Sequence, residues 1–220
     1  MKAVLFDVYE TLLTGSRKED REPLLRTVTD RFGLEFPASQ SLSDRLDQEV
    51  QLEHRQSPEE FPEIDIRDTW RRIFPSLTDA DADGFALAAE EAIHPVTAIG
   101  GARETILEFH QRGIALGIIS NAQAYTKILL DRHLGDAWHC FDPELLFFSY
   151  EHRIAKPDSR LFQLAKERLA VRGIPVSEVL MVGDSIKNDI EPARSVGFRT
   201  HLVPQTLSAP QTLHPDDLQK

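Results

Sequence analysis

The sequence predicts an α/β fold, in which a Rossmann-like parallel sheet carries helices on both faces and an α-helical domain is inserted after the first strand. Two observations support this prediction. Short apolar runs alternate with helix-like segments from about residue 100 onward, and this alternation is typical of a parallel sheet. Residues 14–95, by contrast, are charged and carry apolar residues at helical spacing.

The first predicted element is a buried strand over residues 2–6, which are apolar after Lys2. Asp7 follows it directly. Open parallel sheets hold ligands at the carboxyl ends of their strands, so Asp7 is a candidate nucleophile. The alternative is a turn residue or a helix N-cap, the commoner roles of an Asp after a strand. Thr11, four residues later, is either a contact to the substrate or nucleophile, or a loop anchor.

Residues 14–95 form the next predicted unit, because the sequence changes after Leu13 from apolar to charged and stays so until about Pro95. Four groups of apolar residues at helical spacing predict about four helices. The groups are Leu24, Val28 and Phe32; Leu42, Leu46 and Val50; Trp70, Ile73 and Phe74; and Phe85, Leu87, Ala88 and Ala92. We therefore expect two domains, a core of residues 1–13 and 96–220 and a helical domain of residues 14–95.

Three further strands are predicted at residues 114–119, 179–182 and 200–203, each preceded by a segment with helical spacing. Ser120 and Asn121 come directly after the first of these strands. A hydroxyl and an amide at a strand end are either ligand contacts or, more commonly, helix caps.

Clustered polar residues follow the strand at 179–182, where Gly183, Asp184, Asn188 and Asp189 crowd one turn. Helix capping is the structural alternative for Asn188 and Asp189. Helix capping explains Asp184 less well, because Gly183 before it has no side chain and lets the backbone come close to other groups. A second strand end thus carries carboxylates. In the sequence between Asp7 and this second group of carboxylates, Lys156 precedes a proline at a predicted helix start.

An acid, a hydroxyl, a lysine and paired acids in this order resemble the four motifs of the haloacid dehalogenase (HAD) superfamily of hydrolases. The matching positions are Asp7 to Thr11, Ser120, Lys156, and Gly183 to Asp189, within a resemblance that spans Met1 to about Val203. It is specific because it requires four separated matches in order. It implies that residues 14–95 are a helical cap, which closes over the site, excludes water and selects the substrate.

The resemblance implies a Mg²⁺ site. Asp7, Asp184 and the backbone carbonyl of Tyr9 would be the ligands, since Mg²⁺ prefers oxygen. Asp189 would orient a metal-bound water or hold the loop, and Asn188 beside it would share that role.

The substrate contacts follow from the same resemblance. Asp7 would attack a phosphomonoester to give an aspartyl-phosphate, which water then hydrolyses. Ser120, with Asn121 and the neighbouring backbone amides, would bind the transferring phosphoryl group. Lys156 would balance the charge of Asp7 and of the phosphate, and Thr11 would contact one of them.

Tyr9 departs from the phosphatase pattern, because most phosphatases of this superfamily have a second Asp there, which protonates the leaving group and activates water. A phenol is a poor substitute at neutral pH. Tyrosine at this position is similar to the 2-haloacid dehalogenases, whose halide leaving group needs no proton and which use no metal. Those dehalogenases, however, have a tyrosine where Phe162 stands here, and Ser and Asn in place of the Gly183, Asp184 turn.

We expect a metal-dependent phosphatase for a small phosphomonoester, because paired carboxylates at the fourth motif serve no purpose in displacing halide and would repel a carboxylate substrate. A metal-independent 2-haloacid dehalogenase is the first alternative. A weakly active or non-catalytic relative that binds ligands or partners is the second. Tyr9 keeps both alternatives open.

Composition narrows the function classes. The 220 residues carry a formal net charge of −11 at pH 7, so we expect neither nucleic acid nor an acidic membrane surface as partner. Cys140 is the single cysteine, and no Cys/His cluster has the spacing of a zinc site. No signal peptide and no apolar run of about 18 residues is evident. The sequence predicts a cytoplasmic protein with a small-molecule substrate and indicates no oligomeric state.

Overall fold

The computed structural model describes residues 1–204 and 213–219, so residues 205–212 and 220 of the predicted core domain lie outside the described residues. Its main sheet has five parallel strands in the order β5-β4-β1-β6-β7. These are β1 (Ala3–Phe6), β4 (Ala115–Ser120), β5 (Leu146–Phe148), β6 (Val179–Gly183) and β7 (Arg199–Leu202). β1 is the central strand, and the predicted fold class is confirmed.

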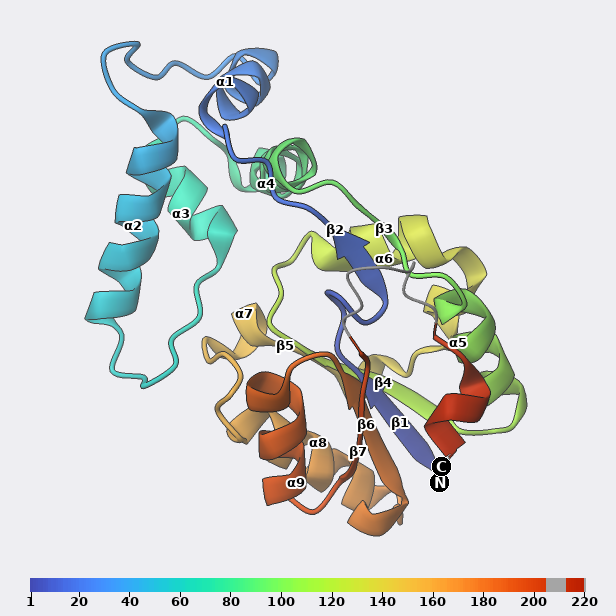
Figure 1. Ribbon diagram of the computed structural model, residues 1–220. Helices are drawn as coiled ribbons and strands as arrows, with labels where there is room; N and C mark the ends of the chain where they lie inside the picture. The colour runs from blue at the N-terminus through green and yellow to red at the C-terminus, as the bar shows by residue number, and fades with distance from the viewer. Residues whose placement is uncertain (205–212, 220) are drawn as a thin grey trace.

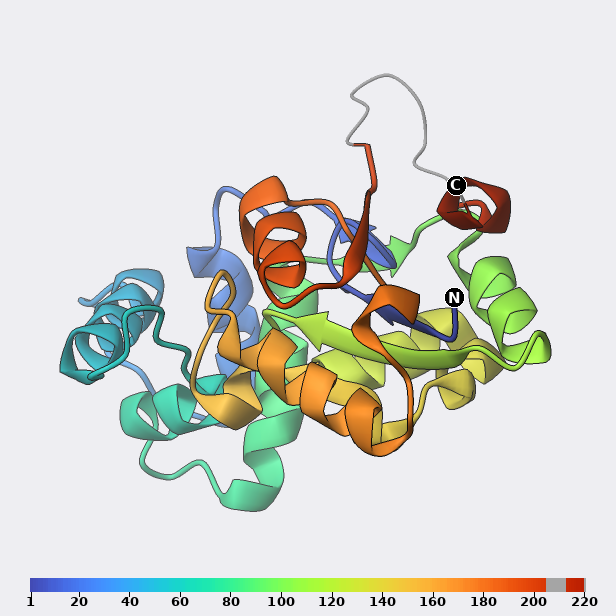
Figure 2. The same ribbon diagram turned by 90° about the horizontal axis from the view of Figure 1, so that it is seen from below.

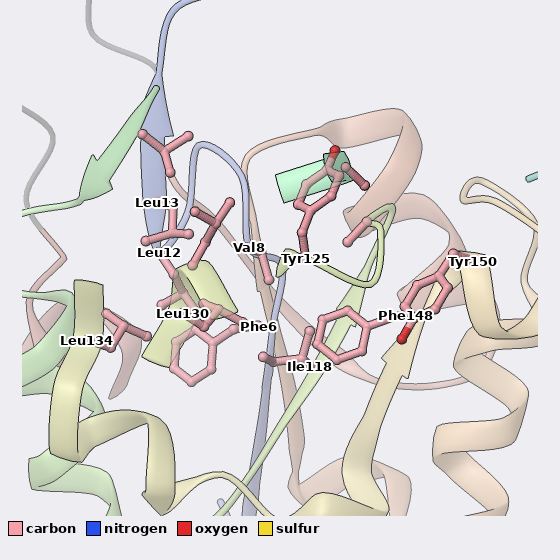
Figure 3. Packing of buried hydrophobic residues seen from close by; sticks show 14 of the residues in the cluster. Phe6, Val8, Leu12, Leu13, Ile118, Tyr125, Leu130, Leu134, Phe148 and Tyr150 are labelled. Carbon is pink, nitrogen blue, oxygen red and sulfur yellow. The ribbon is translucent and has the colours of Figure 1, made fainter. Parts of the chain in front are cut away.

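Helices cover both faces of this sheet (Figures 1 and 2). They are α5 (Ala102–Gln111) and α6 (Thr126–Leu134) on one face, and α8 (Arg160–Val171) and α9 (Glu191–Ser195) on the other. Residues of β1 alternate between the faces, because strand side chains have a period of two. Val4 and Phe6 pack toward α5 and α6, in the cluster shown in Figure 3, and Ala3 and Leu5 pack toward α8 and α9.

Short elements complete the described core. They are α7 (Ser149–His152), the 3₁₀ segments Gly135–Cys140, Pro143–Leu145, Val176–Glu178 and Pro215–Gln219, and a π-helical turn at Ile186–Ile190. In the part of the chain that the structure describes, no helix is both long and apolar enough to cross a membrane.

The segment between residues 14 and 95 contains the four expected helices, and Figure 1 shows them grouped beyond the carboxyl ends of the parallel strands. They are α1 (Glu22–Arg31), α2 (Leu42–Gln56), α3 (Ile66–Ile73) and α4 (Asp79–Ile93). Ser41, Asp65 and Thr78 are the N-caps of α2, α3 and α4, and each side chain accepts a hydrogen bond from a backbone N–H of the first turn. Local sequence therefore determines where three of the helices begin.

Aromatic side chains form the centre of this helical group. The ring of Phe85 lies 5.0 Å from that of Trp70 and 5.5 Å from that of Phe74. Phe32 adds a further edge-to-face contact to Phe85 at 5.2 Å. Because these rings belong to α3, α4 and the end of α1, their packing holds three helices together.

A two-stranded antiparallel ladder, which the sequence did not predict, joins the helices to the core. It pairs β2 (Leu13–Gly15) with β3 (Val96–Ala98), so the chain enters and leaves the helical segment through adjacent strands. At Gly15 an added Cβ would lie only 2.4 Å from the carbonyl oxygen of Pro95, so this close approach requires glycine. Both predicted domain boundaries fall at this ladder.

Candidate active site

Three adjacent strands deliver polar residues to one edge of the sheet. Asp7 follows β1, Asp184 follows β6, and Ser120 ends β4. The backbone N–H of Asp7 donates to the carbonyl of Val182 at 2.9 Å, which aligns the ends of β1 and β6. Parallel strands in register end at the same edge, so residues more than 170 positions apart come together there.

Three carboxylates converge at this edge. Oxygen atoms of Asp7, Asp184 and Asp189 all lie within 4.8 Å of one another. Asp189 is fully buried, Asp7 is 9% exposed and Asp184 is partly buried. Burial, together with the nearby charges of Asp7 and Asp189, raises the pKa of Asp184 to about 6. The cluster is therefore a site of unfavourable negative charge.

Lys156 supplies positive charge to the cluster. Its ammonium lies 2.8 Å from Asp7 Oδ1 and 2.5 Å from Asp189 Oδ1, and it donates to the carbonyl of Ile119 at 3.2 Å. Burial alone would lower the pKa of this ammonium, but the charges of Asp7 and Asp189 outweigh it and raise the pKa. Lys156 is therefore a buried cation, and one ammonium faces three carboxylates.

The turn after β6 holds Asp189 in place. A Cβ on Gly183 would lie 2.5 Å from the carboxyl carbon of Asp189, so only glycine leaves room for this side chain. Asp189 Oδ2 accepts the backbone N–H of Ser185 at 2.9 Å. Ser185 Oγ in turn accepts the N–H of Asn188 at 3.1 Å, so Asn188 lies in the first turn after this cap. The group that approaches Gly183 closely is thus the Asp189 side chain.

Two hydroxyls of predicted site residues have no hydrogen-bond partner among the described residues. They are Ser120 Oγ, at the end of β4, and Thr11 Oγ1, in the turn after β1. Both residues are fully buried. A buried hydroxyl without a partner has lost its hydrogen bonds to water and gained none in the protein, which destabilises the fold by about 1–3 kcal/mol.

The side chain of Asn121 is already engaged with the protein backbone. Its Oδ1 accepts the N–H of Lys156 at 2.7 Å, and its Nδ2 donates to the carbonyl of Lys156 at 3.0 Å. Both ends of the amide thus hold the backbone that carries Lys156, and its predicted contact to substrate stays a prediction.

Tyr9 lies next to the cluster with its hydroxyl bonded away from it. Tyr9 Oη and Thr126 Oγ1 are 3.0 Å apart, and the Tyr9 ring lies against His94 with centroids 5.8 Å apart. Burial raises the pKa of the Tyr9 phenol above its usual value. The predicted use of its backbone carbonyl as a ligand stays a prediction.

A cavity of about 390 Å³ lies between the loops that follow β1 and β4 and the helical segment. Tyr9 and Asn121 line it from the core, and Arg17, Glu63 and Glu90 line it from residues 14–95. A second cavity of about 220 Å³ shares those three charged residues and extends among α2, α3 and α4. No motif marks these charged residues in the sequence, so only the three-dimensional arrangement identifies them.

A family model described as haloacid dehalogenase-like hydrolase matches residues 1–197 of this chain. The chain belongs to that family. As a HAD-like hydrolase it resembles ribulose-1,5-bisphosphate 5-phosphatase of Halopiger xanaduensis, with 29% identity over 60% of this chain and 55% of that protein. It also resembles phosphoserine phosphatase of Thermus thermophilus, with 34% identity over 43% of this chain and 35% of that protein. The chain therefore spans about half or less of these curated relatives.

Solved structures of HAD-like hydrolases share the fold over nearly the whole chain. A HAD phosphatase from Thermococcus onnurineus has a TM-score of 0.61 and 22% identity, covering 95% of this chain and 89% of that one. A 2-haloacid dehalogenase from Pseudomonas syringae has a TM-score of 0.64 and 21% identity, covering 96% of this chain and 92% of that one. Both types of enzyme share this fold, so the fold alone does not choose between the two reactions.

Proposed function

We propose that this HAD-like hydrolase is a Mg²⁺-dependent phosphatase, which hydrolyses a small phosphomonoester through an aspartyl-phosphate on Asp7. The observation that carries the proposal is the convergence of three carboxylates within 4.8 Å around one buried ammonium, that of Lys156. A divalent cation would restore the charge balance of this cluster. The names of the two curated relatives, both phosphatases, agree with it.

The donor set fits Mg²⁺. Asp7 and Asp184, with the backbone carbonyl of Tyr9, would hold the ion, and they offer the oxygen ligands that it prefers. Asp189 is hydrogen-bonded to Lys156 and to the turn after β6. It would not bind the ion directly but would orient a water bound to it or hold the loop, and Asn188 would share that role. When bound, Mg²⁺ supplies charge that lets two anions, a phosphate and a carboxylate, approach each other.

Residues of the chain would carry out the attack on phosphorus and would bind the phosphoryl group. A carboxylate oxygen of Asp7 attacks phosphorus as the bond between phosphorus and the ester oxygen breaks and the alcohol leaves, and water then hydrolyses the aspartyl-phosphate to release phosphate and restore the carboxylate. Lys156 at 2.8 Å neutralises charge on that carboxylate. The unpartnered hydroxyls of Ser120 and Thr11 would donate to phosphoryl oxygens, which would satisfy both groups at once. Asn121 keeps Lys156 in place through its backbone.

No carboxylate stands at the usual position of the acid that protonates the leaving group. Tyr9 is bonded to Thr126 and its raised pKa makes it a weaker acid. The Glu10 carboxylate instead accepts a hydrogen bond from Thr14 Oγ1, in β2, at 2.9 Å. We therefore expect aryl phosphates, whose leaving groups need little protonation, to react faster than alkyl phosphates.

We further propose that residues 14–95 are the cap of this enzyme and that residues 1–13 and 96–220 are its core domain. The cavity of about 390 Å³ between them supports this division, because it places a space for a small substrate directly beside Tyr9 and Asn121. The charged residues of the cap that line it would contact the part of the substrate beyond the phosphate.

A 2-haloacid dehalogenase is the second candidate, and Tyr9 is the observation that favours it. The carboxylates of Asp184 and Asp189 disfavour it, because they would repel a carboxylate substrate.

A paired assay of the purified protein decides between the two reactions. Phosphate release is followed from aryl and alkyl phosphomonoesters, and halide release from 2-chloropropionate, each with Mg²⁺ and with a chelator. The proposal predicts phosphate release that the chelator abolishes, with aryl esters faster than alkyl esters. Halide release that is insensitive to the chelator would contradict it and establish the dehalogenase.

A further inference from the structure

Three segments that are distant in sequence meet beside the 390 Å³ cavity, and each is hydrogen-bonded to the other two. They are residues 121–123 after β4, residues 61–66 between α2 and α3, and residues 153–156 before α8. We call this arrangement the three-segment ring. One of its members belongs to the proposed cap, and another carries Lys156.

The first side of the ring joins residues 121–123 to residues 61–66 through one side chain, that of Gln123. Its Oε1 accepts the N–H of Ile66 at 2.8 Å. Its Nε2 donates to the carbonyl of Ile64 at 3.0 Å and to Glu63 Oε1 at 3.2 Å. Both ends of the Gln123 amide are thus hydrogen-bonded to the proposed cap.

The second side joins residues 61–66 to residues 153–156 through the backbone. The N–H of Glu63 donates to the carbonyl of Arg153 at 3.1 Å, and the N–H of Ala155 donates to the carbonyl of Phe61 at 2.8 Å. These two bonds flank an antiparallel bridge between Pro62 and Ile154. The cap therefore adds a strand-like partner to the loop immediately before Lys156.

The third side closes the ring, because Asn121 holds the N–H and the carbonyl of Lys156. Ser149 connects two of the three segments through its hydroxyl. Its Oγ donates to Glu63 Oε2 at 2.6 Å and accepts the N–H of Ala122 at 2.9 Å. Removing one side would leave the other two less constrained, because the hydrogen bonds of the three sides restrain the same three segments.

We propose that Gln123 is a positioning residue, which seats the cap on the core and, through the three-segment ring, fixes the loop that carries Lys156. When the cap moves away from the core, the hydrogen bonds between the backbone of Phe61 and Glu63 and that loop break as well. The position of the cap and the position of the lysine beside Asp7 are then set by one structural unit. The consequence for turnover rests on the proposed phosphatase activity, whereas the coupling itself does not.

Amide hydrogen exchange of the whole protein, resolved by residue, tests the coupling. Gln123→Met keeps the length of the side chain and removes its amide. We expect exchange at Ile66 to become about tenfold faster or more, and exchange at Glu63 and Ala155 to rise with it, although Gln123 bonds neither of these N–H groups. Gln51→Met is the matched control, because the Gln51 amide oxygen accepts from the exposed Arg55 within α2 and no described bond connects Gln51 to the ring.

Faster exchange at Ile66 with unchanged exchange at Glu63 and Ala155 would overturn the proposal. If Gln123→Met fails to fold, Ser149→Ala removes the hydrogen bond to Glu63 instead, and unchanged exchange at Ala155 in that variant would overturn the proposal equally. Steady-state kinetics with an aryl phosphate adds the functional arm, in which kcat should fall more than KM changes. Unaltered kcat despite faster exchange at Ala155 would refute the link to Lys156. Absence of turnover in the unmutated protein would refute the phosphatase and leave the exchange result standing.

Discussion

The strand-end site and the helical segment use the same contact, the ion pair, in opposite surroundings. At the site the Lys156 side chain is 2% exposed and lies 2.5 Å from Asp189. In α2 the Arg45 side chain is 44% exposed and lies 2.5 Å from Glu49. The distances are equal, so environment and not geometry decides what each pair contributes.

The two regions also differ in charge balance. Glu49 in the helical segment faces two arginines, Arg45 at 2.5 Å and Arg72 at 3.3 Å. At the site the ratio is reversed, because three carboxylates face one ammonium. The difference teaches that the buried excess of negative charge coincides with the residues that we propose to carry the chemistry.

The largest effect is expected from Asp7→Asn, which keeps the shape of the side chain and removes the proposed nucleophile. Phosphate release should fall by a factor of about 10⁴ or more while the protein stays folded. The matched change in the helical segment is Asp83→Asn, at an exposed ion pair with Arg67, and it should leave kcat unaltered. Comparable activity losses in both variants would remove the distinction between the regions.

Lys156→Met comes next, because it leaves Asp7 and Asp189 without their buried partner. We expect the free energy of unfolding in chelator to fall by about 3–5 kcal/mol. Urea denaturation followed by circular dichroism measures it. A loss as small as that of an exposed pair would mean that the carboxylates find another partner or water.

Asp184→Asn tests the excess charge through its pH dependence. The pKa of Asp184 is raised from 3.8 to about 6, so the folded state holds a proton in this window that the unfolded state has lost. Stability in chelator should therefore fall as the pH rises through the window. Asp184→Asn removes this contribution, so the stability of the variant relative to the unmutated protein should increase up to about pH 6 and then level off. A difference that does not vary with pH would show that Asp184 is not held in unfavourable surroundings.

The smallest effect is expected from Arg45→Met, the same replacement as at Lys156 but in an exposed pair. Glu49 keeps its contact to Arg72, and water replaces the lost partner. The free energy of unfolding should change by less than about 1 kcal/mol, measured under the same urea conditions. A loss equal to that of Lys156→Met would contradict the comparison.

Sequence patterns were sufficient for the parts of the molecule in which neighbours in sequence determine structure. The apolar runs predicted β1, β4 and β6, and helical spacing predicted α1 to α4. Asp7, Ser120 and Asp184 could be placed together because parallel strands end at a common edge. A close approach at Gly183 could be expected because the clustered acids follow it directly in the sequence. The structure places the Asp189 side chain against it.

The remaining features depend on contacts between distant residues. β2 and β3 are three residues each, too short for a periodic signal, and their pairing depends on the approach of Gly15 to Pro95. Gln123 bonds residues about 60 positions earlier, and no spacing rule links such positions. The engagement of Asn121 with the backbone of Lys156 was hidden for the same reason.

The covalent intermediate tests the central claim most directly. The protein is mixed with an aryl phosphate and Mg²⁺, quenched in acid during turnover, digested, and the peptides are weighed by mass spectrometry. We predict the added mass of one phosphoryl group on the peptide that contains Asp7, and its absence with chelator or in Asp7→Asn. Turnover that proceeds with no phosphorylated peptide, or with the phosphoryl group on another residue, would contradict the assignment of Asp7 as the nucleophile.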